Sequence, residues 1–193
     1  VQYVHSSLAA ICMSLLPLFT LILAHFMTHD EKFNIHKLIG VIFGILGVAS
    51  LFYGTVTEVD NSLILYLALF GLLLTSFAYA LSGVLIRKLN NKDPFGTSTA
   101  MLIMSSLITV PLALIIEQPW TLTPSASALY SVVVLGVFST GIASLLLFHL
   151  THLTGATFAS YNTYLIPLVG MAAGYIWMDE PLKMTYFISI AFI

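Results

Sequence analysis

Charged side chains are scarce in this chain of 193 residues. Lysine and arginine together number six, aspartate and glutamate number eight, and the charged fraction is 7%, whereas a soluble domain carries about 25%. Hydrophobic residues make up 59%, and a soluble fold of this length could not bury that much apolar surface. The formal charge of −2 provides no basic stripe for a nucleic-acid backbone. The composition therefore excludes a soluble domain and predicts no nucleic-acid partner.

Signals of catalysis and of bound cofactors are also sparse. Cys12 is the only cysteine, so no internal disulfide can form. The sequence contains no His-Glu-x-x-His run, no Gly-x-Ser-x-Gly elbow and no Gly-x-x-x-x-Gly-Lys phosphate loop. His149 and His152 are spaced like metal ligands, but no third ligand is evident nearby. We therefore predict no enzyme, no metal, no cofactor and no ATP-driven pump.

What the sequence does contain is a series of long apolar runs. About 20 helical residues cross the roughly 30 Å hydrocarbon core of a bilayer. Because the runs lack period-two alternation, they predict helices and not strands. The expected spans are Leu8–Met27, His36–Tyr53, Leu63–Ile86, Phe95–Ile116, Ala128–His149 and Ala156–Met178, with a seventh beginning near Thr185. The predicted fold class is an all-α polytopic membrane protein, a helix bundle.

Short polar breaks separate these spans, so neighbouring spans run antiparallel and successive breaks alternate between the two sides of the membrane. The first, third and fifth breaks are residues 28–35, 87–94 and 150–155. With their flanks they hold all but one of the basic residues: Lys32, Lys37, Arg87, Lys88 and Lys92. Because basic loops stay inside the cell, this bias places the three breaks in the cytoplasm.

The two ends of the chain suggest that segments are missing. The chain begins at Val1 without a Met or a basic leader, and it stops at Ile193 after only about eight apolar residues of a new run, which are too few to span a bilayer. We expect further helices before Val1 and a helix cut short at Ile193.

The first and last full spans are similar in sequence. Ser7-Leu8-Ala9 through Leu15-Leu16-Pro17-Leu18 matches Thr157-Phe158-Ala159 through Leu165-Ile166-Pro167-Leu168 without gaps, and Asp30-Glu31 matches Asp179-Glu180 after one extra residue. By the charge bias the two copies have opposite orientations. This pattern indicates an inverted repeat, which is the architecture of many secondary transporters.

The same residues resemble a known family. The run Ser6-Ser7-Leu8-Ala9-Ala10, Leu16-Pro17-Leu18, Asp30-Glu31, Leu38-Ile39-Gly40-Val41 and Gly44-Ile45-Leu46-Gly47-Val48 is similar to the EamA domain of the drug/metabolite transporter superfamily. So is the run Gly155-Ala156, Ile166-Pro167 and Asp179-Glu180-Pro181-Leu182. The resemblance implies about ten helices in two five-helix inverted repeats. Residues 1–55 would then belong to the first repeat, and residues 56–193 would form the second, truncated in its last helix. This piece would hold helices four to nine and parts of three and ten.

The resemblance also implies a function. Members of the family are secondary transporters, so we expect an exporter of small metabolites or drugs that works by alternating access in the cell (inner) membrane. Its partners would be a small-molecule substrate and the lipid bilayer. A non-transporting scaffold or a membrane-embedded enzyme remains the alternative, and the residues do not name the cargo.

Several residues inside the spans suggest mechanical roles. Pro17 and Pro167 each remove a backbone hydrogen bond, so they can kink a helix beside a cavity and contribute to gating; a plain packing kink is the alternative. Small residues let another backbone approach closely, either within the chain or in a homodimer. The glycines concerned are Gly40, Gly44, Gly47, Gly170 and Gly174.

Polar side chains gather on one face of the first and last spans. Lipid cannot satisfy a hydroxyl, so such a face should point to protein or to a water-filled cavity. We predict that Ser14, Ser160 and Tyr164 line a substrate cavity, with Tyr161 and Asn162 to its side. Hydrogen bonds between helices, without any contact to substrate, are the alternative reading of this face.

Two acids and three histidines lie close to the ends of spans. Glu31 and Glu180 recur in the two copies, and we expect them at opposite faces of the membrane, where they steady the ends of helices four and nine, with a role in gating as a further hypothesis. The histidines could carry protons, or they could be interfacial residues in contact with water. They are His25, His149 and His152.

The charge bias generates a prediction about topology. In a Cys12→Ser background, single cysteines at Asn34 and Asn91 should react with an impermeant thiol reagent only from the cytoplasm, and those at Asn61 and Ser125 only from outside. Labelling of Asn61 and Asn91 from the same side would contradict the predicted number of spans.

Overall fold

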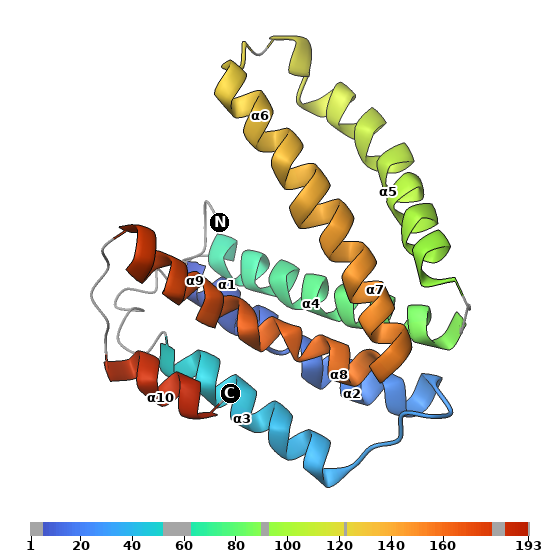
Figure 1. Cartoon of the computed structure of the whole chain (residues 1–193), viewed down its shortest axis with the longest axis vertical. Helices are drawn as coiled ribbons and strands as arrows, with labels where there is room; N and C mark the ends of the chain where they lie inside the picture. Colours follow the sequence, from blue (N-terminus) through green and yellow to red (C-terminus); the bar gives the residue numbers. More distant parts are fainter. Residues whose placement is uncertain (1–5, 52–62, 90–92, 122, 179–183, 193) are drawn as a thin grey trace. The chain divides into compact units, whose positions relative to one another are not determined.

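A computed structural model describes residues 6–51, 63–89, 93–121, 123–178 and 184–192, and these residues are all-helical, with no strand among them (Figure 1). The predicted fold class is thereby confirmed. The chain divides into two compact units, of which unit 1 comprises Val1–Lys88 and Gly155–Ile193 and unit 2 comprises residues 89–154. This division reflects packing and follows different boundaries from the predicted repeats, which stay a prediction.

Unit 1 holds both copies of the repeated sequence. Its helices are α1 (Ser6–Met13), α2 (Leu16–Met27), α3 (Ile35–Leu51), nearly all of α4 (Leu63–Leu89), α8 (Ala156–Ser160), α9 (Asn162–Met178) and α10 (Met184–Phe192). Unit 2 holds α5 (Pro94–Ile116), a short 3₁₀ turn η1 (Pro119–Thr121), α6 (Ala126–Val134), a π-helical segment η2 (Leu135–Ile142) and α7 (Ala143–Thr154).

Four helical segments of the described chain are long and apolar enough to cross a membrane. They are Ala9–Met27, Tyr66–Leu89, Pro94–Ile116 and Ala126–Thr154, and they coincide with four of the six predicted full spans. The second predicted span corresponds to the shorter α3. The sixth is interrupted after Ser160 and continues as α9, which has 17 residues.

The first span is broken directly before its proline. The Leu15 N–H bonds to the Cys12 carbonyl at 3.3 Å, a tighter spacing than in an α-helix, and Pro17 follows at the start of α2. A second donor reaches the same Cys12 carbonyl, because the Ser76 hydroxyl of α4 donates to it at 3.0 Å. Ser76 is fully buried, so the bond lies in an apolar surrounding where water cannot replace it.

The second copy is interrupted at a different place. Tyr161 separates α8 from α9, and its N–H bonds to the Phe158 carbonyl at 3.1 Å. Pro167 lies inside the continuous α9, six residues further along. Each interruption therefore precedes a proline, but the two copies do not break at equivalent positions. Gating by Pro17 and Pro167 stays a prediction.

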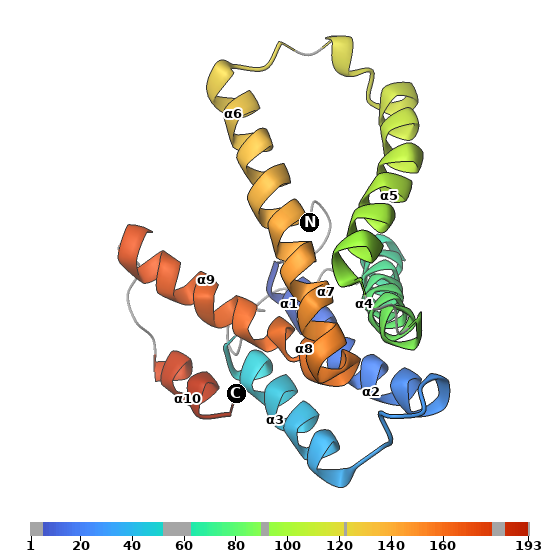
Figure 2. The same ribbon diagram turned by 45° about the vertical axis from the view of Figure 1, so that its right-hand side comes forward.

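Helix α3 is the centre of unit 1 and contacts α1, α2, α9 and α10. It lies beside α10 in both views (Figures 1 and 2), where the Ser50 and Ser189 hydroxyls are 2.8 Å apart. Helix α2 packs against α8 through small side chains. Ala24 and Ala156 form a buried cluster with Val84, and their small size lets the helices approach closely.

Unit 2 is a helical hairpin. Helix α5 begins at Pro94 with Asp93 as its cap, which accepts a bond from the Gly96 N–H at 2.9 Å. Segments α6, η2 and α7 form one continuous helix that approaches α5 through its α7 part (Figure 2), where the rings of Phe95 and His149 stack. Sequence periodicity did not predict the π-helical turn.

The contact at the break in the first span predicts that loss of the Ser76 hydroxyl destabilises the protein. Ser76→Ala removes the donor to the Cys12 carbonyl and should lower the free energy of unfolding by about 1 kcal/mol. The matched control is Ser106→Ala, because Ser106 is exposed and its hydroxyl donates to the Leu102 carbonyl of its own helix. Thermal unfolding of the detergent-solubilised variants measures both, and equal stability of the two would show that the cross-helix bond contributes nothing.

Candidate functional site

A buried carboxylate joins the two copies of the repeat. Glu31 lies in the break after α2 and is 6% exposed. Its Oε1 accepts a hydrogen bond from the Ala156 N–H at 2.5 Å, and its Oε2 accepts one from the Thr157 N–H at 2.9 Å. These amides open α8 and have no partner within their own helix, so the carboxylate satisfies both and its charge suits the positive end of the helix.

The residue before these amides has to be a glycine. Gly155 has a φ of +96°, a conformation that side-chain-bearing residues rarely adopt. A Cβ at this position would also lie 2.8 Å from the Glu31 carboxyl group. We call Glu31 together with Gly155, Ala156 and Thr157 the carboxylate clasp. Sequence reasoning singled out Glu31 but expected it to steady the end of its own helix, whereas it caps the helix of the other copy.

A second acid and a base lie at the same end of unit 1. Arg87 of α4 donates to the Asp30 carboxylate from both Nε, at 2.9 Å, and Nη2, at 2.5 Å. Asp30, Arg87 and Gly155 come from the first, third and fifth breaks. Their position at one end of unit 1 agrees with the predicted alternation of the breaks.

The Asp30 side chain is half exposed, and its environment acts on its charge in two directions. Burial by itself would raise the pKa of Asp30, but the hydrogen bond and charge of Arg87, with the charge of Lys37, outweigh it and lower the pKa from its ordinary 3.8. Since the folded pKa is depressed, the stabilisation from this ion pair is present above pH 3.8 and is lost as the pH falls below it. Exposure keeps that contribution small.

Helices α3 and α9 meet along a seam of tyrosines and glycines. The Tyr164 ring is 4% exposed and lies against Gly44, where a Cβ would overlap it. Its hydroxyl donates to the Val41 carbonyl at 3.1 Å, and the Tyr161 hydroxyl donates to the Lys37 carbonyl at 3.3 Å. The two rings stack with centroids 6.2 Å apart. We call this contact the tyrosine seam.

The predicted cavity residues differ in how exposed they are. Ser14 is 1% exposed and bonds the Ile11 carbonyl at 2.7 Å, and Ser160 is 9% exposed and bonds the Thr157 carbonyl at 2.6 Å. Tyr164 is held in the seam, whereas Asn162 is exposed. These contacts are bonds within the protein, and the role of the residues in a cavity stays a prediction.

The remaining predicted residues have varied surroundings. Gly40 lies near the Tyr161 hydroxyl, Gly47 is buried in α3, and a Cβ at Gly170 would meet no atom within 4 Å in the part of the chain that the structure describes. The surroundings of Gly174 and the whole of Glu180 lie outside the described residues. Within the described ranges no cluster of three or more His, Cys, Asp or Glu could hold a metal.

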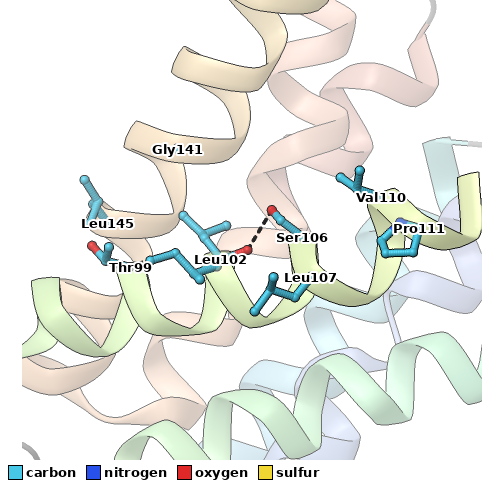
Figure 3. A pocket seen from close by; sticks show the side chains of 9 residues that line it. Thr99, Leu102, Ser106, Leu107, Val110, Pro111, Gly141 and Leu145 are labelled. Carbon is cyan, nitrogen blue, oxygen red and sulfur yellow. Dashed lines mark hydrogen bonds between the residues drawn. The ribbon is translucent and has the colours of Figure 1, made fainter. Parts of the chain in front are cut away.

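A groove of about 530 Å³ lies within unit 2, between α5 and the helix formed by η2 and α7 (Figure 3). Its lining is mainly apolar, with the Thr99 and Ser106 side chains among its polar groups. Pro111 and Gly141 line it from opposite helices. Sequence reasoning did not single out this face, although Pro111 within a predicted span could have drawn attention to it.

Four long apolar helical segments among the described residues, in a chain without strands in that part, are what a polytopic integral membrane protein requires. The chain belongs to the EamA-like transporter family, whose model matches residues 1–53 and 66–193. The resemblance seen in the sequence is thereby confirmed.

Two curated relatives are similar to this chain. It is 22% identical to the uncharacterized transporter YoaV of Bacillus subtilis (strain 168) over 93% of the chain and 61% of that protein. It is 27% identical to an uncharacterized transporter of Archaeoglobus fulgidus over 94% of the chain and 63% of that protein. The chain thus spans about three fifths of the length of these relatives. No solved structure matches it significantly.

The tyrosine seam predicts a strong effect of one methyl group. Gly44→Ala places a Cβ 2.2 Å from the nearest atom of the Tyr164 ring and should destabilise the protein by about 1–3 kcal/mol. Gly170→Ala is the control, since its Cβ would meet no atom within 4 Å among the described residues, and this substitution should be neutral or slightly stabilising.

A double variant tests whether this cost comes from the contact itself. In Gly44→Ala with Tyr164→Ala the methyl has room, so the free energies of unfolding of the two single variants should not add. Thermal unfolding in detergent gives these values. Additive costs would contradict the close packing of the seam.

Proposed function

We propose that this protein is a secondary transporter that exports small metabolites or drugs across the cell (inner) membrane by alternating access. The observation that carries the proposal is the junction of the two repeat copies in unit 1. Glu31 of the first copy binds the backbone of the second, and α3 packs on α9 through the tyrosine seam. Membership in a family of transporters supports the same conclusion.

The geometry suits two copies that move against each other. Each copy contains an interrupted helix: the first breaks near its middle, at Ser14–Leu15, and the second near its start, at Tyr161. A helix can bend at such a point because its regular series of backbone hydrogen bonds is already broken there. Discontinuous helices in matching spans of inverted repeats are typical of substrate sites in transporters, and here both matching spans are interrupted, although at different places along their length. Pro17 and Pro167 would guide the bending.

The partners of the proposed transporter follow from its surface and family. Large apolar side chains cover the outside of the helices, as a surface in contact with the lipid bilayer requires. The cargo would be a small molecule bound beside Ser14, Ser160 and Tyr164. A homodimer is the further proposal for Gly170, where a second helix could approach closely.

Reconstitution tests the transport activity directly. Proteoliposomes that contain the full-length protein should take up or release at least one member of a panel of labelled metabolites, including amino acids, nucleobases and amphipathic drugs, faster than empty liposomes. Counterflow with unlabelled compound identifies a carrier. A folded, correctly inserted protein that moves none of the panel would contradict the proposal for these classes and favour a scaffold or an enzyme.

The proposed cavity predicts separate effects on cargo affinity and stability. Tyr164→Phe and Ser160→Ala should each change the apparent affinity for the transported compound, with only about 0.6 kcal/mol lost from the free energy of unfolding for each bond removed. Tyr175→Phe is the matched control, because Tyr175 is exposed on the same helix as Tyr164.

Thiol labelling tests whether the helix face that carries Ser14, Ser160 and Tyr164 is accessible to water. In a Cys12→Ser background, single cysteines at positions 14, 160 and 164 should react with water-soluble reagents in the full-length protein. If all three resist modification, the face is dry and the cavity assignment is wrong.

A further inference from the structure

We propose that the carboxylate clasp is a latch: it closes one face of the transporter, and each transport cycle breaks and re-forms it. This inference rests on the proposed function and assigns its gate to a defined set of atoms. The latch consists of the Glu31 carboxylate and a seat formed by Gly155 and the Ala156 and Thr157 amides.

The position of the clasp suits a closure between moving parts. Its bonds join residues 125 and 126 positions apart in the sequence and therefore connect the end of one copy of the repeat to the start of the other. The buried cluster of Ala24, Val84 and Ala156 lies directly beside the seat, because Ala156 belongs to both. With the clasp closed, small side chains pack at this point and leave Ala156 and Thr157 almost inaccessible to water.

The chemistry of the clasp lets it open without breaking the fold. Both partners are groups that water can also satisfy, since a carboxylate accepts and backbone amides donate hydrogen bonds. A purely apolar closure has no such exchange, because opening would expose its surface without compensation. The neighbouring Asp30 does not share this role, because it is half exposed and pairs with Arg87.

One feature keeps the closed form from being overly stable. The Thr157 hydroxyl is fully buried and has no hydrogen-bond partner in the described part of the chain, so closing leaves one polar group unsatisfied. Gly155 holds a φ of +96° to present the seat. Gly155 is therefore a positioning residue for the latch, because any side chain there would occupy the space of the carboxylate.

Thiol accessibility measures the latch independently of transport. The reporter is Ser160→Cys in a Cys12→Ser background, one helical turn beyond the seat. Its modification by an impermeant reagent is compared in inside-out and right-side-out membrane vesicles.

The test variant is Glu31→Gln. It keeps the shape of the side chain but replaces one carboxylate oxygen by an amide NH₂ group, which cannot accept a hydrogen bond from the backbone N–H that it faces. We expect modification from the face that carries the clasp to become about tenfold faster, a change of about 1.4 kcal/mol in the closing equilibrium, and modification from the opposite face to become slower.

Two comparisons make the test specific. Glu117→Gln removes the same charge from an exposed acid in unit 2 and should leave both rates unchanged. Gly155→Ala should accelerate modification as Glu31→Gln does, and the double variant should show less than the product of the two effects, because both act on one contact. If Gly155→Ala does not fold, Glu31→Gln decides the question, since thermal unfolding reports separately on its stability.

The outcomes separate the latch from the proposed function. Unchanged rates in a folded Glu31→Gln variant, or equal acceleration from both faces, would overturn the latch even if the protein transports a compound. The expected one-sided change in a protein that transports nothing would support the clasp as a closure and contradict the assignment as a transporter.

Discussion

A backbone polar group within the hydrocarbon core of a membrane needs a partner within the protein, because hydrocarbon offers none. The interruptions of the helices in this chain show how that demand is met. Where the first span breaks, a serine from another helix reaches the Cys12 carbonyl. Where α8 begins, the Glu31 carboxylate receives two amides. These two tertiary contacts of unit 1 are therefore placed where its helices stop being regular, and the Glu31 contact also connects the two copies of the repeated sequence.

This arrangement gives few polar residues a large structural role. In a chain with 7% charged residues, one buried carboxylate and one serine connect segments more than 60 positions apart. The tyrosine seam adds two hydroxyls that bind carbonyls of α3. Removing an apolar side chain at these places would leave a cavity, whereas removing the Glu31 carboxylate would leave two backbone amides without a partner. The loss of a polar side chain has the more specific effect, because only another correctly placed hydrogen-bonding group can replace the missing bond.

Much of the fold could be predicted from the sequence because its signals are local. The length of the apolar runs predicts the helices, and the matching runs around Pro17 and Pro167 predict the repeat and the family. The partner of Glu31 could not be predicted, because the bond goes to backbone amides, which carry no mark in the sequence. The only visible sign was Gly155, and its positive φ became apparent only from the structure. The surroundings of Tyr164 could not be predicted for a similar reason. A hydroxyl on a polar helix face can be hydrogen-bonded either to water or to another part of the protein. The contact of Tyr164 with Gly44 depends on how α3 and α9 approach each other.

The π-helical segment has a geometric consequence for the span that contains it. A π turn accommodates one residue more than an α turn, so the residues that follow it are rotated by about 100° relative to a regular helix. Side chains in α6 and α7 that a helical wheel would place on one stripe consequently point in different directions. The face of α7 that meets α5 is thus out of phase with the sequence pattern of α6. One inserted residue therefore gives a single long helix two faces that are rotated relative to each other.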